Sequence, residues 1–188
     1  MAKVLCWRGD VNPDMPADYG HTPLSLAALR GHEGVVRILL SREEVNPDRP
    51  DDDGKTPLSY AAWGGHEGVV RILLGREEVN PDRPDDYGKT PLWSAAENGY
   101  EGVVRILLGR KEVNPDKPDN KGRTPLALAA KNGHEGVVIS LLAREEVDPD
   151  KPDNDGQTPR MLAAMCSHPG VKALLQPLEA VIHGPSEV

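Results

Sequence analysis

One motif in this sequence begins with the residue types of a hydrolytic metal site. His-Glu-Gly-Val-Val, starting at His66, shares its first two residues with a zinc-protease helix. Such a helix needs a second histidine four residues after the first, so that both metal ligands lie on one face. Val70 stands at that position, and the other copies of the motif also have valine there. The motif therefore predicts no zinc site, and we interpret His66 as a packing residue at the start of a helix.

A second motif is acidic. The segments 51–54 (Asp-Asp-Asp-Gly) and 153–156 (Asp-Asn-Asp-Gly) have the composition of half a calcium loop. A complete loop begins with an acidic ligand five residues before its glycine and closes with a glutamate. Arg49 and Lys151 stand at the first position, and the closing glutamate is absent. We interpret both segments as solvated acidic arms and predict no metal site, with a calcium-loaded array as a distant third alternative.

The remaining composition predicts neither catalysis nor a bound cofactor. Glycines are scattered singly, and no Ser/His/Asp arrangement has support beyond composition. Cys6 and Cys166 lie near opposite ends of the chain, which favours two reduced cysteines. The net charge of -8 disfavours nucleic acid or a membrane surface as partner, because both attract basic proteins. Residues 1–11 have no apolar run long enough for a signal peptide, so we expect a cytoplasmic or nuclear protein.

The elements that must position any site repeat along the chain. The triplet Thr-Pro-Leu at Thr56 returns at Thr22, Thr90 and Thr124, and in altered form at Thr158, always 34 residues apart. A fixed period of 20–50 residues predicts a stack of repeats. The chain then divides into a partial half-repeat at 1–11, repeats at 12–45, 46–79, 80–113 and 114–147, a capping repeat at 148–181 and a tail at 182–188. The half-repeat indicates either a truncated cap or a piece cut from a longer protein.

Each repeat has the signals of two short helices and an arm. Thr56 is a predicted N-cap, and Pro57 occupies the first helical position. Gly65 is predicted to end the first helix in the left-handed conformation, and the second helix begins at 66–67. Gly68 recurs in the second helix, which predicts close backbone packing. The two prolines of each connecting segment exclude a helix there and predict an extended, hairpin-like arm.

Helix, tight turn, helix and projecting arm, with Thr-Pro-Leu, Ala-Ala and Gly-His, resemble the ankyrin repeat. The resemblance covers nearly the whole chain and implies an all-α solenoid, a stack of about five helix-turn-helix units with hairpin-like arms. The sequence departs from the usual ankyrin repeat in lacking histidine after Thr-Pro-Leu and in having an Asn-Pro-Asp insertion that lengthens the arm. This variant is similar to the repeat tails of fungal nucleotide-binding receptor-like proteins, which implies, as one alternative, a sensor segment of a larger multidomain receptor.

The resemblance implies recognition of a protein or peptide in a concave groove between arm tips and first helices. The second and third repeats differ at 7 of 34 positions, five of which we assign to the first helix and one to the arm tip. This pattern predicts a copied core and one variable surface. The predicted partner-binding residues are Tyr19, His21, Leu29, Arg30, Asp53, Lys55, Trp63, Tyr87, Lys89, Trp93, Glu97, Asn98, Lys121, Arg123 and Lys131.

Two alternatives concern individual side chains in that set. Tyr87, Trp63 and Trp93 are the first candidates because Tyr and Trp are enriched among interface hot spots. Trp93, like Tyr60, can instead fill a gap between neighbouring helices. The cations at positions 55, 89 and 123 form a predicted ladder, which either neutralises the arm aspartates of neighbouring repeats or holds acidic side chains of a partner.

Two classes of function follow from the sequence. The first is a non-catalytic recognition module with a groove about 40–50 Å long, since adjacent helix layers lie about 8–10 Å apart. The second is a structural array whose copies stack end to end. We expect a monomer, with weak end-to-end self-association as the alternative. The sequence does not identify the partner.

Overall fold

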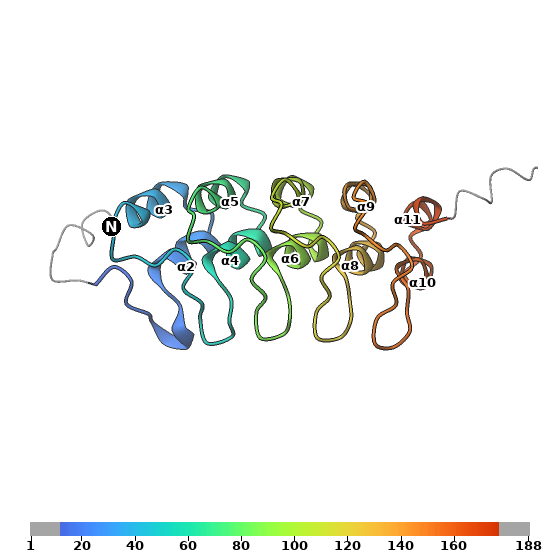
Figure 1. Cartoon of the computed structure of the whole chain (residues 1–188), viewed down its shortest axis with the longest axis horizontal. Helices are drawn as coiled ribbons and strands as arrows, with labels where there is room; N and C mark the ends of the chain where they lie inside the picture. The colour runs from blue at the N-terminus through green and yellow to red at the C-terminus, as the bar shows by residue number, and fades with distance from the viewer. Residues whose placement is uncertain (1–11, 177–188) are drawn as a thin grey trace, which may run out of the picture.

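The computed structural model describes residues 12–176, which form an elongated stack of helix pairs (Figure 1). The predicted half-repeat at 1–11, with Cys6, and the tail at 182–188 lie outside the described residues. The first helices of the pairs are α2 (Pro23–Leu29), α4 (Pro57–Trp63), α6 (Pro91–Glu97), α8 (Pro125–Asn132) and α10 (Pro159–Met165). The second helices are α3 (Glu33–Leu40), α5 (Glu67–Leu74), α7 (Glu101–Leu108), α9 (Glu135–Leu142) and α11 (Pro169–Leu174).

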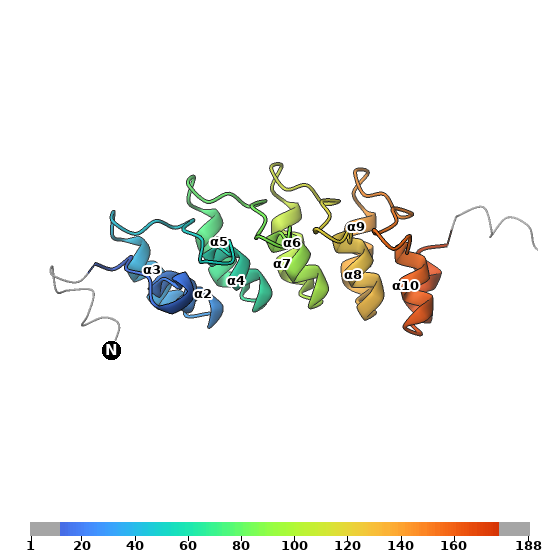
Figure 2. The ribbon, with the colours of Figure 1, turned by 90° about the horizontal axis from the view of Figure 1, so that it is seen from below.

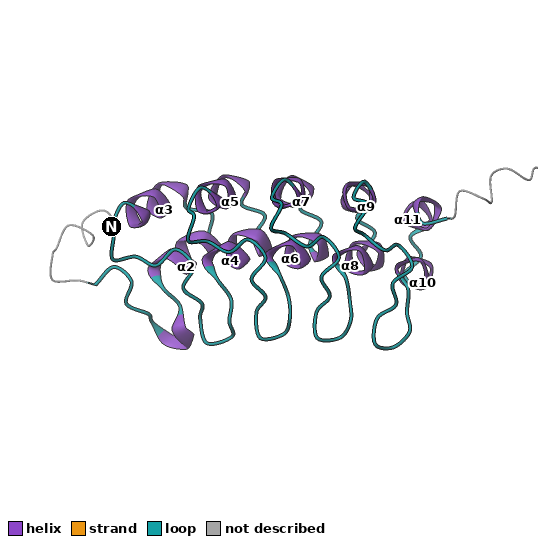
Figure 3. Ribbon diagram, in the orientation of Figure 1, coloured by secondary structure: helices purple, strands orange, loops and turns teal. Residues whose placement is uncertain are grey.

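The two sets of helices form two parallel rows, and loops project from the row of first helices (Figures 1 and 3). Seen from below, the helix pairs follow one another in chain order along the long axis (Figure 2). A short 3-10 helix, η1 (Asp18–Gly20), lies in the first arm, and residues 12–176 contain no strand. The predicted all-α solenoid of about five repeats is confirmed.

Each first helix begins as its sequence predicts. The hydroxyl oxygen of Thr56 accepts a hydrogen bond from the backbone N–H of Ser59 at 3.2 Å, with Pro57 at the start of the helix. The equivalent threonines of the other four repeats make the same bond. The cap satisfies one of the free N–H groups of the first turn, and proline has no N–H to lose there.

A left-handed residue joins the two helices of each repeat. Gly65 has φ +72°, a conformation that glycine adopts without steric cost. In the last repeat Ser167 takes this place with φ +60°, so the turn is kept although the glycine is lost. The predicted role of Gly65 is confirmed.

The core is continuous along the stack because small and branched side chains alternate within it. Leu58, Ala61 and Ala62 of α4 are fully buried, as are Val70 and Leu73 of α5. The alanines let α4 lie close to its neighbours α2 and α6, against which it packs. Each repeat therefore buries its apolar face on the next one, which stabilises short helices that are marginal alone.

The arms are tight hairpin-like turns, as predicted. The backbone N–H of Asp51 donates to the carbonyl oxygen of Lys55 at 3.0 Å, and Gly54 N–H donates back to Asp51 at 3.0 Å. Neighbouring arms are joined as well, since the N–H of Asp86 donates to the carbonyl oxygen of Asp53 at 3.0 Å. This bond recurs between other neighbouring arms, which holds the arm tips in a row.

Ion pairs also connect the bases of successive arms. Arg83 donates to the carboxylate of Asp48, one repeat earlier, with 3.2 Å between Nη1 and Oδ2. The equivalent pairs are Arg49–Asp14, Lys117–Asp82 and Lys151–Asp116, at 3.1, 3.0 and 2.7 Å. In each of these four aspartates the other oxygen, Oδ1, is buried and has no hydrogen-bond partner within the described chain.

One expectation about the second helices is wrong. The recurring glycine at Gly68 was predicted to allow close approach of backbones. A β-carbon at Gly68 would instead meet the side-chain carboxylate of Glu33 from the preceding repeat, and Gly102 faces Glu67 in the same way. The glycine makes room for a flexible acidic side chain, a relationship that the sequence period alone does not show.

Candidate functional site

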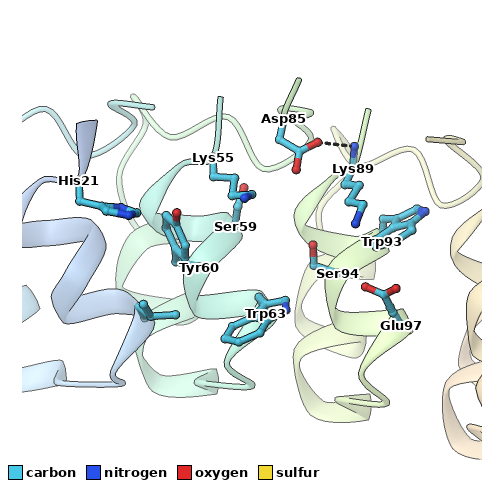
Figure 4. Close-up of a pocket in the computed structure, with 11 residues that line it drawn as sticks. His21, Lys55, Ser59, Tyr60, Trp63, Asp85, Lys89, Trp93, Ser94 and Glu97 are labelled. Carbon is cyan, nitrogen blue, oxygen red and sulfur yellow. Dashed lines mark hydrogen bonds between the residues drawn. The ribbon is translucent and has the colours of Figure 1, made fainter. Parts of the chain in front are cut away.

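A pocket of about 400 Å³ lies between the arms and the first helices of the first three repeats (Figure 4). We call the surface between arms and first helices the groove, and this cavity the groove pocket. Its lining residues are His21, Leu29, Lys55, Ser59, Tyr60, Trp63, Asp85, Lys89, Trp93, Ser94 and Glu97.

The groove pocket brings together seven of the predicted partner-binding residues. These are His21, Leu29, Lys55, Trp63, Lys89, Trp93 and Glu97. The others lie along the arms and helix ends outside this pocket: Tyr19, Arg30, Asp53, Tyr87, Asn98, Lys121, Arg123 and Lys131. Tyr87 and Tyr19, which are 54% and 79% exposed, form aromatic arm tips.

The two tryptophans of adjacent repeats have opposite environments. Trp63, on the last turn of α4, is 54% exposed and forms one wall of the pocket (Figure 4). Trp93, on the first turn of α6, is fully buried. The expectation that Trp93 offers an open surface to a partner is therefore wrong, and the packing alternative holds.

Trp93 is buried because the following repeats cover its ring. It belongs to a small apolar cluster with Ala127, Leu128 and Leu162. Its indole N–H donates to the carbonyl oxygen of Arg123 at 3.0 Å, which satisfies the one polar group of the side chain. Trp93 thus gives the pocket a rigid back wall.

Tyr60 forms another fixed wall, and it was not among the predicted partner-binding residues. Its hydroxyl donates to the carboxylate of Asp51 at 2.5 Å, and its ring lies edge-on to His21 with 5.5 Å between centroids. Burial and this carboxylate both raise the pKa of Tyr60 well above its usual value. Tyr60 is half-buried, so it partly fills the gap between neighbouring helices and partly faces the groove pocket.

The ladder of cations is neutralised differently from the prediction. Lys55 pairs with Asp53 at 3.0 Å, and Arg123 pairs with Asp119 at 2.6 Å. Both partners belong to the same arm as the cation, so neutralisation of aspartates across repeats is the wrong expectation. Burial by itself lowers the pKa of Lys55, but Asp53 and other nearby carboxylates outweigh it and raise that pKa.

Lys89 differs from the other two cations. Its ammonium lies 4.4 Å from the centroid of the Trp93 ring and forms no ion pair with any described residue. The backbone N–H of Lys89 is held by Asp85, whose Oδ1 accepts it at 2.8 Å (Figure 4). The structure therefore fixes the base of this side chain and leaves its charge facing the pocket.

Glu97 carries the second open charge of the pocket. It is the last residue of α6, and its backbone carbonyl oxygen accepts from Asn132 at 2.8 Å and from the His134 ring at 3.0 Å. Its carboxylate has no hydrogen bond or ion pair within residues 12–176. In Figure 4 this carboxylate is at the same end of the pocket as Trp63, away from the arms.

The sites that vary between the second and third repeats are not confined to the surface. Two of the seven positions, Ser59/Trp93 and Tyr60/Ser94, have at least one buried side chain. Two others, Gly64 and His66, lie in the turn after α4. The repeats therefore vary part of their core together with the groove, contrary to the expectation of a copied core.

The described part of the chain offers neither a metal site nor a membrane-spanning helix. Residues 12–176 contain no group of three or more His, Cys, Asp or Glu side chains placed to hold a metal ion. None of the helices in that range has the length and apolar character needed to cross a membrane.

Comparison with known protein families agrees with the repeat pattern. The family described as "Ankyrin repeats (3 copies)" matches residues 1–85 and 111–183, and the family described as "Ankyrin repeat" matches residues 87–120. Together these matches span nearly all of the chain. No curated protein matches it.

Proposed function

The chain belongs to the ankyrin-repeat family, and we propose that it is a non-catalytic module that holds a partner polypeptide in the groove. Ankyrin repeats are generally protein–protein interaction modules. The observation that carries the proposal is Trp63, a large apolar side chain that is 54% exposed at the edge of the groove pocket. Exposed aromatic side chains beside a preformed cavity are typical of binding surfaces.

The surroundings of Trp63 support this proposal. Leu29, from the preceding repeat, adds apolar surface to the same pocket, and Tyr87 adds an exposed ring at an arm tip. The walls behind them are fixed by hydrogen bonds of Tyr60 and Trp93. A preformed surface loses little conformational entropy when a partner binds, which favours affinity.

The shape of the surface favours a polypeptide over a small molecule. Arm tips are joined by backbone hydrogen bonds into a row, and the first helices form a second row beside it. The groove pocket, at about 400 Å³, is large enough for one or two side chains, while the rows continue past it toward the fourth and fifth repeats. An extended segment can follow this surface and place one side chain in the pocket.

A pull-down from native cell extract tests the proposal. The full chain is compared with a Trp63→Ala/Tyr87→Ala variant and with an Ile139→Ala control. Ile139 is a matched control because it is an apolar side chain, 55% exposed, on the row of second helices. Circular dichroism first establishes that each variant folds.

We expect a protein that is retained by the wild type and by Ile139→Ala and lost by the groove variant. Equal retention by all three proteins would contradict recognition through the groove. Light scattering of the same samples addresses the alternative of an end-to-end array, which predicts growth in mass with concentration. If the chain is instead a sensor segment of a larger receptor, recognition would still depend on the groove. The same pull-down therefore tests that alternative.

A further inference from the structure

Resting on the function proposed above, we infer that the groove selects an extended segment with a specific charge pattern. In this segment an apolar side chain lies between one acidic and one basic residue that are about three positions apart. The apolar side chain stacks on Trp63, the acidic residue meets Lys89, and the basic residue meets Glu97.

The acidic position follows from the unusual state of Lys89. The cations at the equivalent positions, Lys55 and Arg123, are each paired with an aspartate of their own arm. Lys89 has no such partner in the described chain, and its ammonium lies over Trp93 inside the pocket. In a chain of net charge -8, an unpaired cation in a cavity is out of keeping with its surroundings. A carboxylate from a partner would give Lys89 the ion pair that Lys55 and Arg123 already have.

Asp85 also lines this pocket but does not cancel the charge of Lys89. Its Oδ1 accepts hydrogen bonds from the backbone N–H groups of Tyr87 and Lys89 at 3.0 and 2.8 Å. These bonds hold the carboxylate in the turn of the arm, where the side chain is nearly buried. The ammonium of Lys89 is left as the cation available to a ligand at the arm end of the pocket.

The basic position follows from Glu97 in the same way. Its carboxylate lines the pocket without a hydrogen bond or ion pair to residues 12–176. Figure 4 shows it across from Trp63, at the end of the pocket far from the arms. A basic residue of the partner would give this carboxylate the ion pair that it lacks within the described chain.

The spacing follows from helix geometry. The first and last residues of α6, Pro91 and Glu97, are about 9 Å apart along the helix axis, at about 1.5 Å per residue. Lys89 lies just before the first of these residues. An extended segment advances about 3.3 Å per residue, so about three residues cover this distance. Charge complementarity of this kind contributes more to specificity than to affinity.

The test is a selection of random 12-residue peptides displayed on phage, with the full chain as bait. Four baits are compared: wild type, Lys89→Glu, Glu97→Lys and Trp63→Ala, each confirmed as folded by circular dichroism. The wild type should enrich peptides with an apolar residue between one acidic and one basic residue. Lys89→Glu should enrich two basic residues, and Glu97→Lys should enrich two acidic ones.

A consensus peptide from the wild-type selection, labelled with fluorescein, then gives affinities. We expect about tenfold weaker binding to Lys89→Glu, restored when the acidic residue of the peptide is changed to lysine. The same charge pattern from the wild type and from both charge variants would overturn the inference while leaving groove binding intact. Enrichment that is unchanged in Trp63→Ala, or no enrichment by the wild type, would overturn the proposed function as well.

Discussion

The indole N–H of Trp93 donates a hydrogen bond to the backbone carbonyl oxygen of Arg123, 3.0 Å away. This bond joins the third repeat to the arm of the fourth, and the ring itself is fully buried. Trp63, at a different position of the preceding repeat, is 54% exposed and makes no equivalent bond within the described chain. The two tryptophans thus differ in environment: Trp93 is part of the packed core, and Trp63 is open to the partner proposed above.

Trp93→Ala should lower the free energy of unfolding by about 3–5 kcal/mol, because it leaves a large cavity and an unpaired carbonyl group. Trp63→Ala should change it by less than about 1 kcal/mol, since an exposed side chain is removed. Urea unfolding followed by circular dichroism measures both. Similar losses for the two variants would contradict the assigned environments.

Gly34 and Gly68 stand at equivalent positions of two second helices, so the effects of alanine on stability can be compared between them. Gly34→Ala should raise the free energy of unfolding by up to about 1 kcal/mol, because no described atom lies within 4 Å of its β-carbon position. Gly68→Ala should gain less, since the carboxylate of Glu33 must move. A double-mutant cycle with Glu33→Ala measures this coupling. Equal gains at both glycines, with no coupling, would show that the Glu33 carboxylate does not occupy that space.

Asp48, one of the buried arm aspartates, predicts a dependence of stability on acidic pH. Burial raises the pKa of Asp48 above its ordinary value of 3.8, although Arg83 acts against this. A raised folded-state pKa means that the folded protein holds the proton more tightly than the unfolded chain. The contribution of Asp48 to the free energy of unfolding is therefore largest below pH 3.8 and is lost as the pH rises through the folded-state value.

The contribution of Asp48 is isolated by comparison with the Asp48→Asn variant, in which the side chain at position 48 does not titrate. The difference in unfolding free energy between wild type and variant, measured in urea from about pH 3 to pH 7, should shift in favour of the wild type as the solution becomes more acidic. A shift in the opposite direction would mean that Arg83 dominates and that the pKa of Asp48 is lowered.

Tyr60 predicts a signature at alkaline pH. Its folded-state pKa lies well above the ordinary value of 10.0, because of burial and the Asp51 carboxylate. In a titration monitored at 295 nm, the ionisation of Tyr60 should therefore occur at a pH well above 10.0. Its contribution to stability is present below pH 10.0 and is lost above it, as the unfolded chain begins to ionise. In Tyr60→Phe the delayed ionisation should be absent, and its persistence would assign it to another tyrosine.

Much of the fold could be predicted because the signals are local and repeated. The cap at Thr56, the proline after it and the left-handed Gly65 each act within one turn of chain. Their fixed period then implies stacking, and the structure has these features as expected. The contact between Gly68 and Glu33 could not be predicted in the same way, because it depends on how far one helix is shifted along its neighbour.

The site could be predicted only in part. The sequence indicates which positions vary, but a first-helix position can face the groove or the next repeat. Trp93 stands where three of the other repeats have the small buried residues Ser25, Ser59 and Ala127, a signal that could have indicated packing. Lys89 lacks the ion pair of Lys55 because Tyr87 stands at the position equivalent to Asp53, the partner of Lys55. This difference is visible in the sequence, but its meaning depends on knowing that Lys55 pairs within its own arm.

The most direct test of recognition through the groove is site-specific photocrosslinking. A benzoylphenylalanine is placed at position 63, in the groove, or at position 139, on the row of second helices, and the protein is irradiated in native extract. Mass spectrometry then identifies the adducts. We expect a polypeptide adduct at position 63 that is absent at position 139. Adducts at position 139 only, or the same adducts at both positions, would contradict recognition through the groove.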